Sequence, residues 1–385
     1  MFFSTLVLMA ALTPAQLAQQ ALIVDTHIDA PSEQVREWVN LGAMDKRNFS
    51  YASARKGGLD VAFMSIYTSP TADEQGTAEQ IANQQIDAIE AMVYRNPGKF
   101  VIIKDPNEIA KNKGKIMLAF GMENAAPIGD SLAKLKQFAD RGVAYITLAH
   151  SANNRLSDSS YSIEKKWNGL SPFGKDVVKE MNRLGVMVDV SHLSDASAMD
   201  AINLSAVPVI ATHSSFRHFT PGFERNVSDE LAKAIAAKGG VIQVTFGVQF
   251  VDPKAAKNTQ NYFTELKNFK DQYARDIAAG VKPKQTEAEF DKQWDIDHPV
   301  VKIDLKAVAD HIEYGVKLVG IDHIGIGSDF DGVGESLPTD LKTAADYPNL
   351  VAELRKRGFT DAQLRKILGE NTIRLWKQVR AARKA

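Results

Sequence analysis

The chain of 385 residues is 44% hydrophobic and 24% charged, a composition typical of a globular protein with ample material for a core. A formal net charge of −1 at pH 7 creates no field that would attract nucleic acid or an anionic membrane, so neither is expected as a partner. Because the chain contains no cysteine, disulfides, thiol catalysis and cysteine-ligated metal are excluded.

The N-terminal segment Met1–Leu12 is apolar and precedes Thr13-Pro14-Ala15-Gln16. It is too short to span a bilayer comfortably and resembles the hydrophobic region and cleavage zone of a secretory signal peptide, although it contains no Lys or Arg. We therefore expect residues 1–20 to be a signal peptide or a disordered arm, and the protein to be periplasmic or secreted rather than cytoplasmic. A truncated or mis-started N-terminus is the alternative. No other stretch is apolar and long enough to predict a membrane span in the mature chain.

Eight short apolar runs alternate with segments of helical periodicity, the pattern of βα units around a parallel sheet. The runs are Leu22–Thr26, Val61–Ile66, Ile116–Phe120, Ala144–Leu148, Val186–Val190, Val207–Ala211, Val241–Phe246 and Ile324–Gly327. They predict one α/β domain over residues 21–385, a (β/α)8 TIM-type barrel in which functional residues lie at the C-terminal ends of the strands. Helix starts are predicted at four polar residues that can cap a first turn: Asp130, Ser171, Ser228 and Thr360.

Two stretches depart from the simple repeat. Residues 67–113 contain a long polar helical pattern, and residues 248–303 form a helical excursion between the seventh and eighth strands. Six apolar residues of the excursion recur at helical spacing: Tyr262, Phe263, Leu266, Phe269, Tyr273 and Ile277. We expect this stripe to pack against the barrel. A subunit interface, as in a homodimer, and a lid over the site are the alternatives.

His, Asp or Glu side chains follow six of the eight runs, and four of the eight histidines of the chain are among them. His27 and Asp29 point the same way from the first strand, because side chains two residues apart share a face. The others are Glu123, His150, His192, His213 and Asp329. Any one of them could be structural, but a single metal centre accounts for all. His218, His298, His311 and His323 fall outside the pattern and are interpreted as structural.

The number of candidate ligands indicates two metal ions. One catalytic zinc ion takes about three protein ligands, whereas five candidates converge here. A carboxylate can bridge two ions, and imidazole with carboxylate suits zinc and its neighbours. The charge of two divalent ions would be balanced by Asp29, Glu123, Asp329 and a bridging hydroxide.

These residues lie in motifs that, in this combination and order, resemble the membrane dipeptidase (renal dipeptidase, peptidase M19) family over nearly all of residues 22–385. The motifs are Asp25-Thr26-His27-Ile28-Asp29-Ala30-Pro31, Gly121-Met122-Glu123, Leu148-Ala149-His150-Ser151, Val188-Asp189-Val190-Ser191-His192-Leu193, Thr212-His213-Ser214-Ser215, Arg225-Asn226-Val227, Gly327-Ser328-Asp329-Phe330-Asp331-Gly332-Val333 and Gly369-Glu370-Asn371-Thr372.

The resemblance implies a dipeptidase, tolerant of a D-residue at the C-terminal position, in which a hydroxide bridging two Zn²⁺ ions attacks the peptide bond. It implies these metal ligands: His27 and Asp29 on one ion, His192 and His213 on the other, and Glu123, also catalytic, between them. His150 would polarise the scissile carbonyl and stabilise its oxyanion, and Arg225 would bind the free carboxylate of the substrate. Asp329, which also contacts substrate, would pass the proton of the attacking water to the leaving amine.

One departure from the family concerns substrate contact. Mammalian-type members have an aromatic residue shortly after strand seven, whereas here Phe246 is followed by Gly247. Two other classes are considered. Another amidohydrolase-type binuclear hydrolase, such as a lactonase, deaminase or amidase, would usually have His-x-His on strand one. An inactive barrel that serves as a binding protein would be expected to lack a ligand or Asp329, and none is missing.

Overall fold

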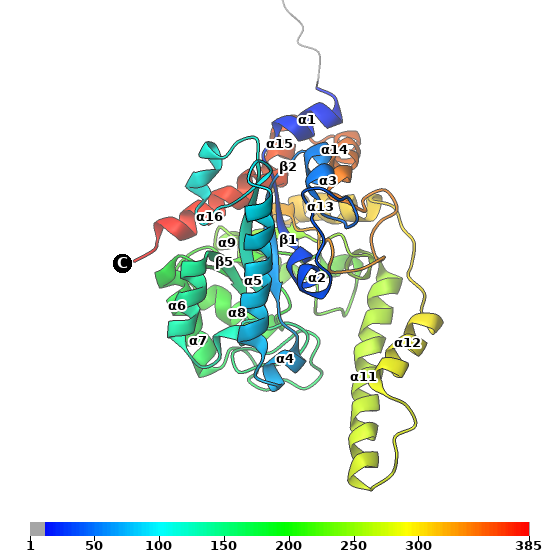
Figure 1. Cartoon of the computed structure of the whole chain (residues 1–385). Coiled ribbons are helices and arrows are strands. Elements are labelled where there is room, and N and C mark those ends of the chain that lie inside the picture. Colours follow the sequence, from blue (N-terminus) through cyan, green and yellow to red (C-terminus); the bar gives the residue numbers. More distant parts are fainter. Residues whose placement is uncertain (1–11, 385) are drawn as a thin grey trace, which may run out of the picture.

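Eight parallel strands form the barrel in this computed structural model, which describes residues 12–384 (Figure 1). Hydrogen-bonded neighbours follow the order of the chain: β1 (Ile23–Ile28), β2 (Leu59–Tyr67), β4 (Ile116–Glu123), β5 (Val143–Thr147), β6 (Met187–Asp189), β7 (Ile210–Ala211), β8 (Val241–Val244) and β9 (Ile324–Ile326). Each of the eight predicted runs overlaps one of these strands, so the predicted (β/α)8 architecture is confirmed.

The barrel closes between its first and last strands just beyond the end of β9. There Ile28 and Phe330 form a parallel bridge. The Asp29 N–H donates to the Phe330 carbonyl at 2.8 Å, and the Asp329 N–H donates to the His27 carbonyl at 3.0 Å. The seam is therefore completed at the C-terminal end of the strands, among residues predicted to function.

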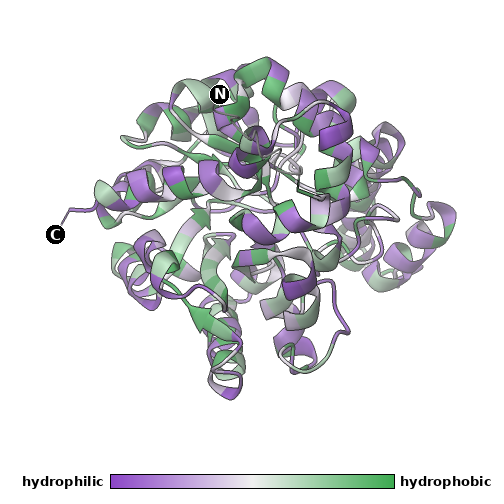
Figure 2. Cartoon of the chain, turned by 90° about the horizontal axis from the view of Figure 1, so that it is seen from above, coloured by the Kyte–Doolittle hydropathy of each residue, from purple (hydrophilic) through white to green (hydrophobic). Residues whose placement is uncertain are grey.

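Helices surround this barrel, and their ribbons alternate hydrophobic and hydrophilic residues in Figure 2, as expected for helices with one buried face. The longer ones are α5 (Ala78–Arg95), α6 (Leu132–Arg141), α7 (Pro172–Leu184), α8 (Asp195–Leu204), α9 (Asp229–Ala237), α13 (Lys306–Val319), α14 (Tyr347–Lys356) and α16 (Asn371–Ala381). Shorter ones are α2 (Ala30–Arg36), α3 (Tyr51–Gly57), α4 (Pro70–Glu74), α10 (Val248–Val251) and α15 (Asp361–Arg365).

Three of the four predicted caps begin helices. Ser171, Ser228 and Thr360 accept backbone hydrogen bonds at the starts of α7, α9 and α15. The prediction at Asp130 is wrong by one residue, since the hydroxyl of Ser131 accepts from the Lys134 N–H at 3.3 Å and caps α6. Asp and Ser are both favoured at a helix N-cap, so the residue type alone does not distinguish the two positions.

A ninth strand in the described residues, β3 (Phe100–Ile102), was not predicted. It pairs with the start of β4 outside the barrel path. It lies within residues 67–113, where the helical pattern of α5 dominates, and three residues give too short a run to stand out.

The folded unit begins before residue 21. Pro14–Gln20 form α1, which starts with a capping box between Thr13 and Gln16. Leu17 and Ala18 are fully buried, and α1 packs against α14. The predicted arm is therefore wrong for residues 13–20, whose cap and buried residues make them part of the fold. Residues 1–11, where the signal peptide is predicted, lie outside the described residues.

The excursion forms a helical hairpin, α11 (Pro253–Ala278) and α12 (Glu287–Asp297), that projects from the barrel in Figure 1. On α11 only Ala255 and Ala256 are buried. Within the apolar stripe, Phe269 packs on α12, 5.0 Å from Phe290 between ring centroids, whereas Tyr273 and Ile277 are exposed. The predicted packing against the barrel is therefore wrong for most of the stripe, because periodicity reveals an apolar face but not its partner.

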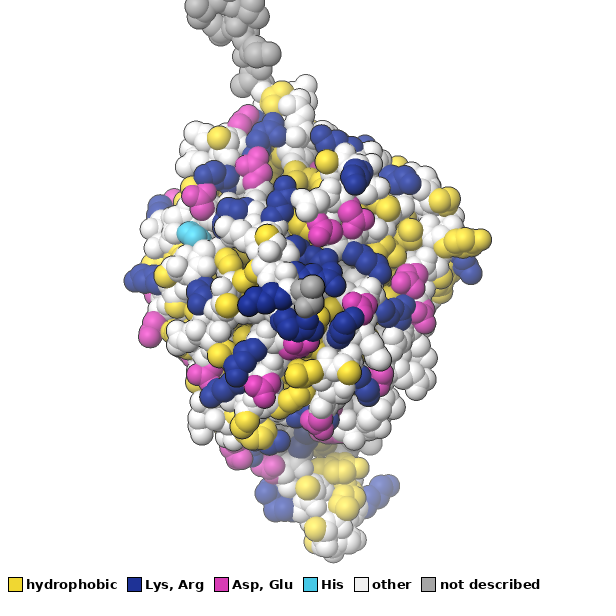
Figure 3. All heavy atoms as spheres, turned by 90° about the vertical axis from the view of Figure 1, so that its left-hand side faces the viewer, with side chains coloured by type: hydrophobic (Ala, Val, Ile, Leu, Met, Phe, Trp, Pro, Cys, Tyr) yellow, Lys and Arg dark blue, Asp and Glu magenta, His cyan; other side chains and the backbone are white. Residues whose placement is uncertain are grey.

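Within residues 12–384, no helix combines the length and the apolar character needed to cross a lipid bilayer. On the face shown in Figure 3, basic side chains are densest near the end of α16, with acidic side chains between them. This mixture agrees with the near-neutral net charge.

Burial of α1 predicts the effect of truncating its central side chain. Leu17→Ala should lower the free energy of unfolding by about 2–5 kcal/mol, because it removes a fully buried side chain. Urea denaturation followed by circular dichroism measures this change. Gln20→Ala, at an exposed position of the same helix, serves as the control, and equal stability of the two variants would contradict the packing of α1.

Candidate metal centre

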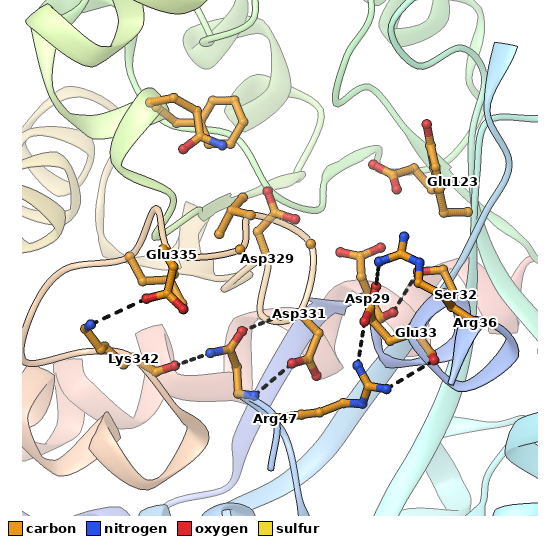
Figure 4. A pocket seen from close by; sticks show the side chains of 18 of the residues that line it. Asp29, Ser32, Glu33, Arg36, Arg47, Glu123, Asp329, Asp331, Glu335 and Lys342 are labelled. Atoms are coloured by element: carbon orange, nitrogen blue, oxygen red, sulfur yellow. Dashed lines mark hydrogen bonds and ion pairs between the residues drawn. The ribbon is translucent and has the colours of Figure 1, made fainter. Parts of the chain in front are cut away.

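The C-terminal ends of six barrel strands bring the predicted site residues together. His27 lies in β1 and Glu123 ends β4, while the others lie on the loops that follow their strands. In Figure 4, Asp29, Glu123 and Asp329 converge on the same space, and Glu335 and Lys342 lie farther out. All of these predicted residues are buried except His150, which is partly exposed: His27, Asp29, Glu123, His192, His213, Asp329 and Arg225.

Glu123 lies between two groups of imidazoles. Its Oε2 is 3.5 Å from Nε2 of His27, which is itself 3.5 Å from Oδ2 of Asp29. Its Oε1 is 3.0 Å from Nε2 of His192 and 3.2 Å from Nε2 of His213. The two oxygens of Glu123 thus face different pairs of candidate ligands, the arrangement that a bridging carboxylate requires. Which residues ligate which ion stays a prediction.

The chemistry of this donor set fits a metal. Nε2 of His192 and Nε2 of His213 are 2.7 Å apart, and Nε2 of His27 is buried without a hydrogen-bond partner among residues 12–384. Three overlapping groups in the described chain have ligand atoms within 4.8 Å of one another: His27 with Glu123 and His213, Glu123 with His150 and His192, and His27 with Asp29 and Asp329. Converging lone pairs and buried carboxylates are unfavourable unless a cation compensates them.

The pKa shifts of His27, Glu123 and Asp29 also indicate that this site favours a positive charge. Burial disfavours the imidazolium of His27, but Glu123 and Asp29 raise the pKa of His27 to about 10. Burial would raise the pKa of Glu123, yet His27 and His150 hold it well below its usual range. For Asp29, burial raises the pKa well above its ordinary value. The raised pKa keeps a proton on the imidazole of His27, and a metal ion that bound this imidazole would release the proton.

His150 differs from His27 in its protonation state. Burial lowers the pKa of His150 to about 4, so the imidazole is neutral at pH 7 and offers an N–H donor. Its Nε2 lies 3.5 Å from Oε1 of Glu123, and its ring meets the edge of Tyr67 at 4.8 Å between centroids. Tyr67, at the end of β2, was not predicted as a site residue, because no His, Asp or Glu follows that strand.

Hydrogen bonds behind the ligands fix which imidazole nitrogen faces the centre. The Thr212 hydroxyl donates to Asp189 at 2.7 Å, so its oxygen accepts from the Nδ1–H of His213 at 2.9 Å. Because the proton is then on Nδ1, the Nε2 of His213 has a free lone pair. Nδ1 of His27 lies 2.9 Å from the Tyr145 hydroxyl. Sequence reasoning did not find this support, although a buried Asp189 inside an apolar strand was a visible indication of it.

Arg225 lies beside the imidazoles and is itself buried. Nη1 donates to the Ser214 hydroxyl at 2.9 Å and Nη2 to the His213 carbonyl at 2.7 Å, while Nε has no partner in the described part of the chain. Nη2 is also 3.1 Å from Nε2 of His192. The guanidinium lies over the ring of Phe250, 4.9 Å from its centroid. The structure therefore brings Arg225 to the centre, and its role stays a prediction.

The loop that carries Asp329 has a strained backbone. Asp329 and Asp331 both have positive φ angles, 67° and 65°, which cost energy for residues other than glycine. Paired bonds stabilise the loop, because Asp331 accepts from the Asn48 N–H at 2.8 Å and the Asn48 side chain accepts from the Asp331 N–H at 2.9 Å. At Gly332 a Cβ would lie 2.2 Å from a carboxylate oxygen of Asp29, so a larger residue there would displace that carboxylate.

A cavity of about 870 Å³ opens over the centre. Its lining includes the aromatic residues Tyr161, Phe250 and Phe263 and charged residues such as Arg47 and Lys342. Aromatic residues therefore line the cavity from α10 (Phe250) and α11 (Phe263), beyond the seventh barrel strand. Their positions could not be predicted, because they depend on where the segment after that strand lies in the fold.

A (β/α)8 barrel that gathers imidazoles and carboxylates under an open cavity at its C-terminal face defines the class of metal-dependent barrel hydrolases. The sequence model of the membrane dipeptidase family, peptidase family M19, matches residues 13–385, and the chain belongs to this family. The dipeptidase prediction is therefore confirmed at this level: the protein is a metal-dependent dipeptidase.

Individual relatives agree with this assignment. An uncharacterised dipeptidase of Schizosaccharomyces pombe is 32% identical over 385 aligned positions, covering 94% of this chain and 82% of the relative. The crystal structure of the probable dipeptidase PvdM from Pseudomonas aeruginosa is 28% identical with a TM-score of 0.81, covering 96% and 98% of the two chains. A metallopeptidase of Rhodobacter sphaeroides, solved with a phosphinate mimic of L-Ala-D-Ala, shares the fold at 21% identity with a TM-score of 0.75, covering 93% and 99%.

The contact behind His27 predicts an effect on metal affinity. Tyr145→Phe removes the hydroxyl that orients His27, and should weaken metal binding about 10–100-fold. Competition with a chromogenic chelator measures this affinity. Tyr314→Phe is the matched control, because its hydroxyl donates to Asp229 on α9, far from the centre. Equal affinities in the two variants would show that the Tyr145 hydroxyl does not support the ligand.

Proposed function

We propose that this dipeptidase uses two zinc ions, held by His27 and Asp29, by His192 and His213, and by Glu123 between them. The observation that carries the proposal is the position of Glu123, whose two oxygens face different imidazoles at 3.5 Å and 3.0 Å. Imidazole and carboxylate ligands without sulfur suit zinc. Two bound zinc ions would supply hydroxide at neutral pH and polarise the scissile carbonyl.

Asp329 is the proposed proton carrier. It lies in one cluster with His27 and Asp29, and burial raises its pKa above the ordinary value against the opposing effect of His27. A carboxylate with a raised pKa can take the proton of the attacking water and release it to the amine nitrogen as the C–N bond breaks. The strained loop holds this carboxylate over the centre.

His150 and Arg225 are the proposed substrate contacts. The neutral imidazole of His150 can donate its N–H to the oxyanion that forms as the carbonyl is attacked. Within the described residues, the Nε of Arg225 has no hydrogen-bond partner, and a guanidinium suits the oxygens of a free carboxylate. A free carboxylate at this point would restrict cleavage to the last peptide bond of a substrate.

We also propose that the enzyme accepts D-residues at the C-terminal position. The cavity of about 870 Å³ leaves room for a side chain on either side of the backbone. The metallopeptidase of Rhodobacter sphaeroides was solved with a mimic of L-Ala-D-Ala, which is consistent with this proposal.

The central test combines metal analysis with a panel of L,L- and L,D-dipeptides. We expect two zinc ions per chain and hydrolysis of dipeptides by the wild type. Asp329→Asn should keep the zinc but lose about 10²–10⁴-fold in kcat, because it removes a proton carrier while leaving the ligands. Full retention of activity in Asp329→Asn would exclude its role, and failure to bind more than one ion would exclude the binuclear mechanism.

Export and a homodimer are further proposals. The apolar segment Met1–Leu12 supports export, and exposed apolar residues on the hairpin, such as Ile277 and Ile296, support contact with a second copy, which sedimentation would detect. If a signal peptide is removed, we expect cleavage no later than Thr13, because the packed α1 follows. Mass spectrometry of the mature N-terminus in the exported fraction measures this, and a mature chain that begins after Leu17 would contradict it.

A further inference from the structure

One side chain connects the projecting hairpin to the substrate cavity. Phe263 of α11 lines the cavity, and its ring lies 4.2 Å from that of Tyr161 with 32° between the planes. The preceding residue, Tyr262, faces α12, where its hydroxyl donates to Asp291 at 2.8 Å. Thus α11 contacts α12 on one side and the cavity on the other.

One ion pair also joins the loop that carries Tyr161 to α11. Lys267, one helical turn after Phe263, has its Nζ 3.5 Å from the carboxylate of Glu164 in this loop. The Asn153 amide donates to the Glu164 carbonyl at 2.6 Å. The loop and α11 therefore meet at this ion pair as well as at the rings of Tyr161 and Phe263.

This pair lies close to the segment that carries Arg225. The ring of Tyr161 is 5.9 Å from His192 and 6.1 Å from Phe223. The same loop contacts the segment next to Arg225, because Lys165 donates to Glu224 at 2.8 Å. The cavity is also lined by charged residues: Glu33, Arg36, Lys46, Arg47, Glu335 and Lys342.

We propose that Tyr161 and Phe263 form a subsite for an apolar side chain on the C-terminal residue of the dipeptide. The inference rests on the proposed function, in which Arg225 binds the carboxylate of that residue. A side chain attached next to this carboxylate meets the aromatic pair and removes apolar surface from water. The hairpin thereby takes part in substrate selection, and α12 holds α11 in place.

The test compares three substrates: L-Ala-L-Ala, L-Ala-L-Leu and L-Leu-L-Ala. In Phe263→Ala, the kcat/KM for L-Ala-L-Leu relative to L-Ala-L-Ala should fall about 10-fold or more, mainly through KM, because a hydrophobic contact discriminates by about this factor. The value for L-Leu-L-Ala relative to L-Ala-L-Ala should stay unchanged. Phe263→Leu, which keeps an apolar side chain, should restore most of the preference.

Phe269→Ala is the matched control. Phe269 lies on the same helix and packs on Phe290 at 5.0 Å, so its loss perturbs the hairpin without touching the cavity. Its substrate ratios should equal those of the wild type. An unchanged ratio in Phe263→Ala, an equal loss on all three substrates, or a change confined to L-Leu-L-Ala would each overturn the subsite. A wild type that cleaves no dipeptide would instead reject the proposed function itself.

Discussion

Glu123 places a buried carboxylate where the ends of the barrel strands converge, with imidazoles on both of its sides. Burial makes each charge in this site costly. Burial raises the pKa of Asp29, whereas the neighbouring histidines lower the pKa of Glu123, so the two buried carboxylates respond to the site in opposite ways. Asp189, acting through Thr212, orients the imidazole of His213, and Tyr145 orients that of His27. Both hydrogen bonds direct an imidazole nitrogen toward the centre, where a cation can bind its lone pair. The arrangement of these buried imidazoles and carboxylates at the C-terminal face of the barrel thus calls for the positive charge of a metal cation.

The sequence predicted the barrel and most of the centre because both depend on local patterns. Strands buried on two faces appear as continuous apolar runs, and a ligand at a strand end is the residue just beyond such a run. The pattern failed where local information was insufficient. The short run of β3 lay within a helical stretch, and α1 follows so closely on an apolar segment that its own cap at Thr13 was overlooked.

Contacts between distant segments account for the remaining differences. The stripe on α11 was recognised as apolar, but periodicity does not tell whether the barrel or α12 covers it. Similarly, Tyr145 and His27 meet although 118 residues separate them in the chain, and Phe263 meets Tyr161 from a different segment. Such residues carry no pattern of their own, so the three-dimensional structure is needed to find them.

The seam of the barrel has a consequence for the order in which the protein matures. The Thr26 hydroxyl donates to the Ile326 carbonyl at 3.2 Å across 300 residues of chain, and Asp29 and Asp329 lie in the same seam. Until β9 joins β1, His27 and Asp29 therefore lie at the end of a strand with one unpaired edge. Such long-range closure is slow to form. The metal pocket is therefore complete only after β9 and the loop that carries Asp329 have joined β1, so a chain without its last strand cannot assemble it.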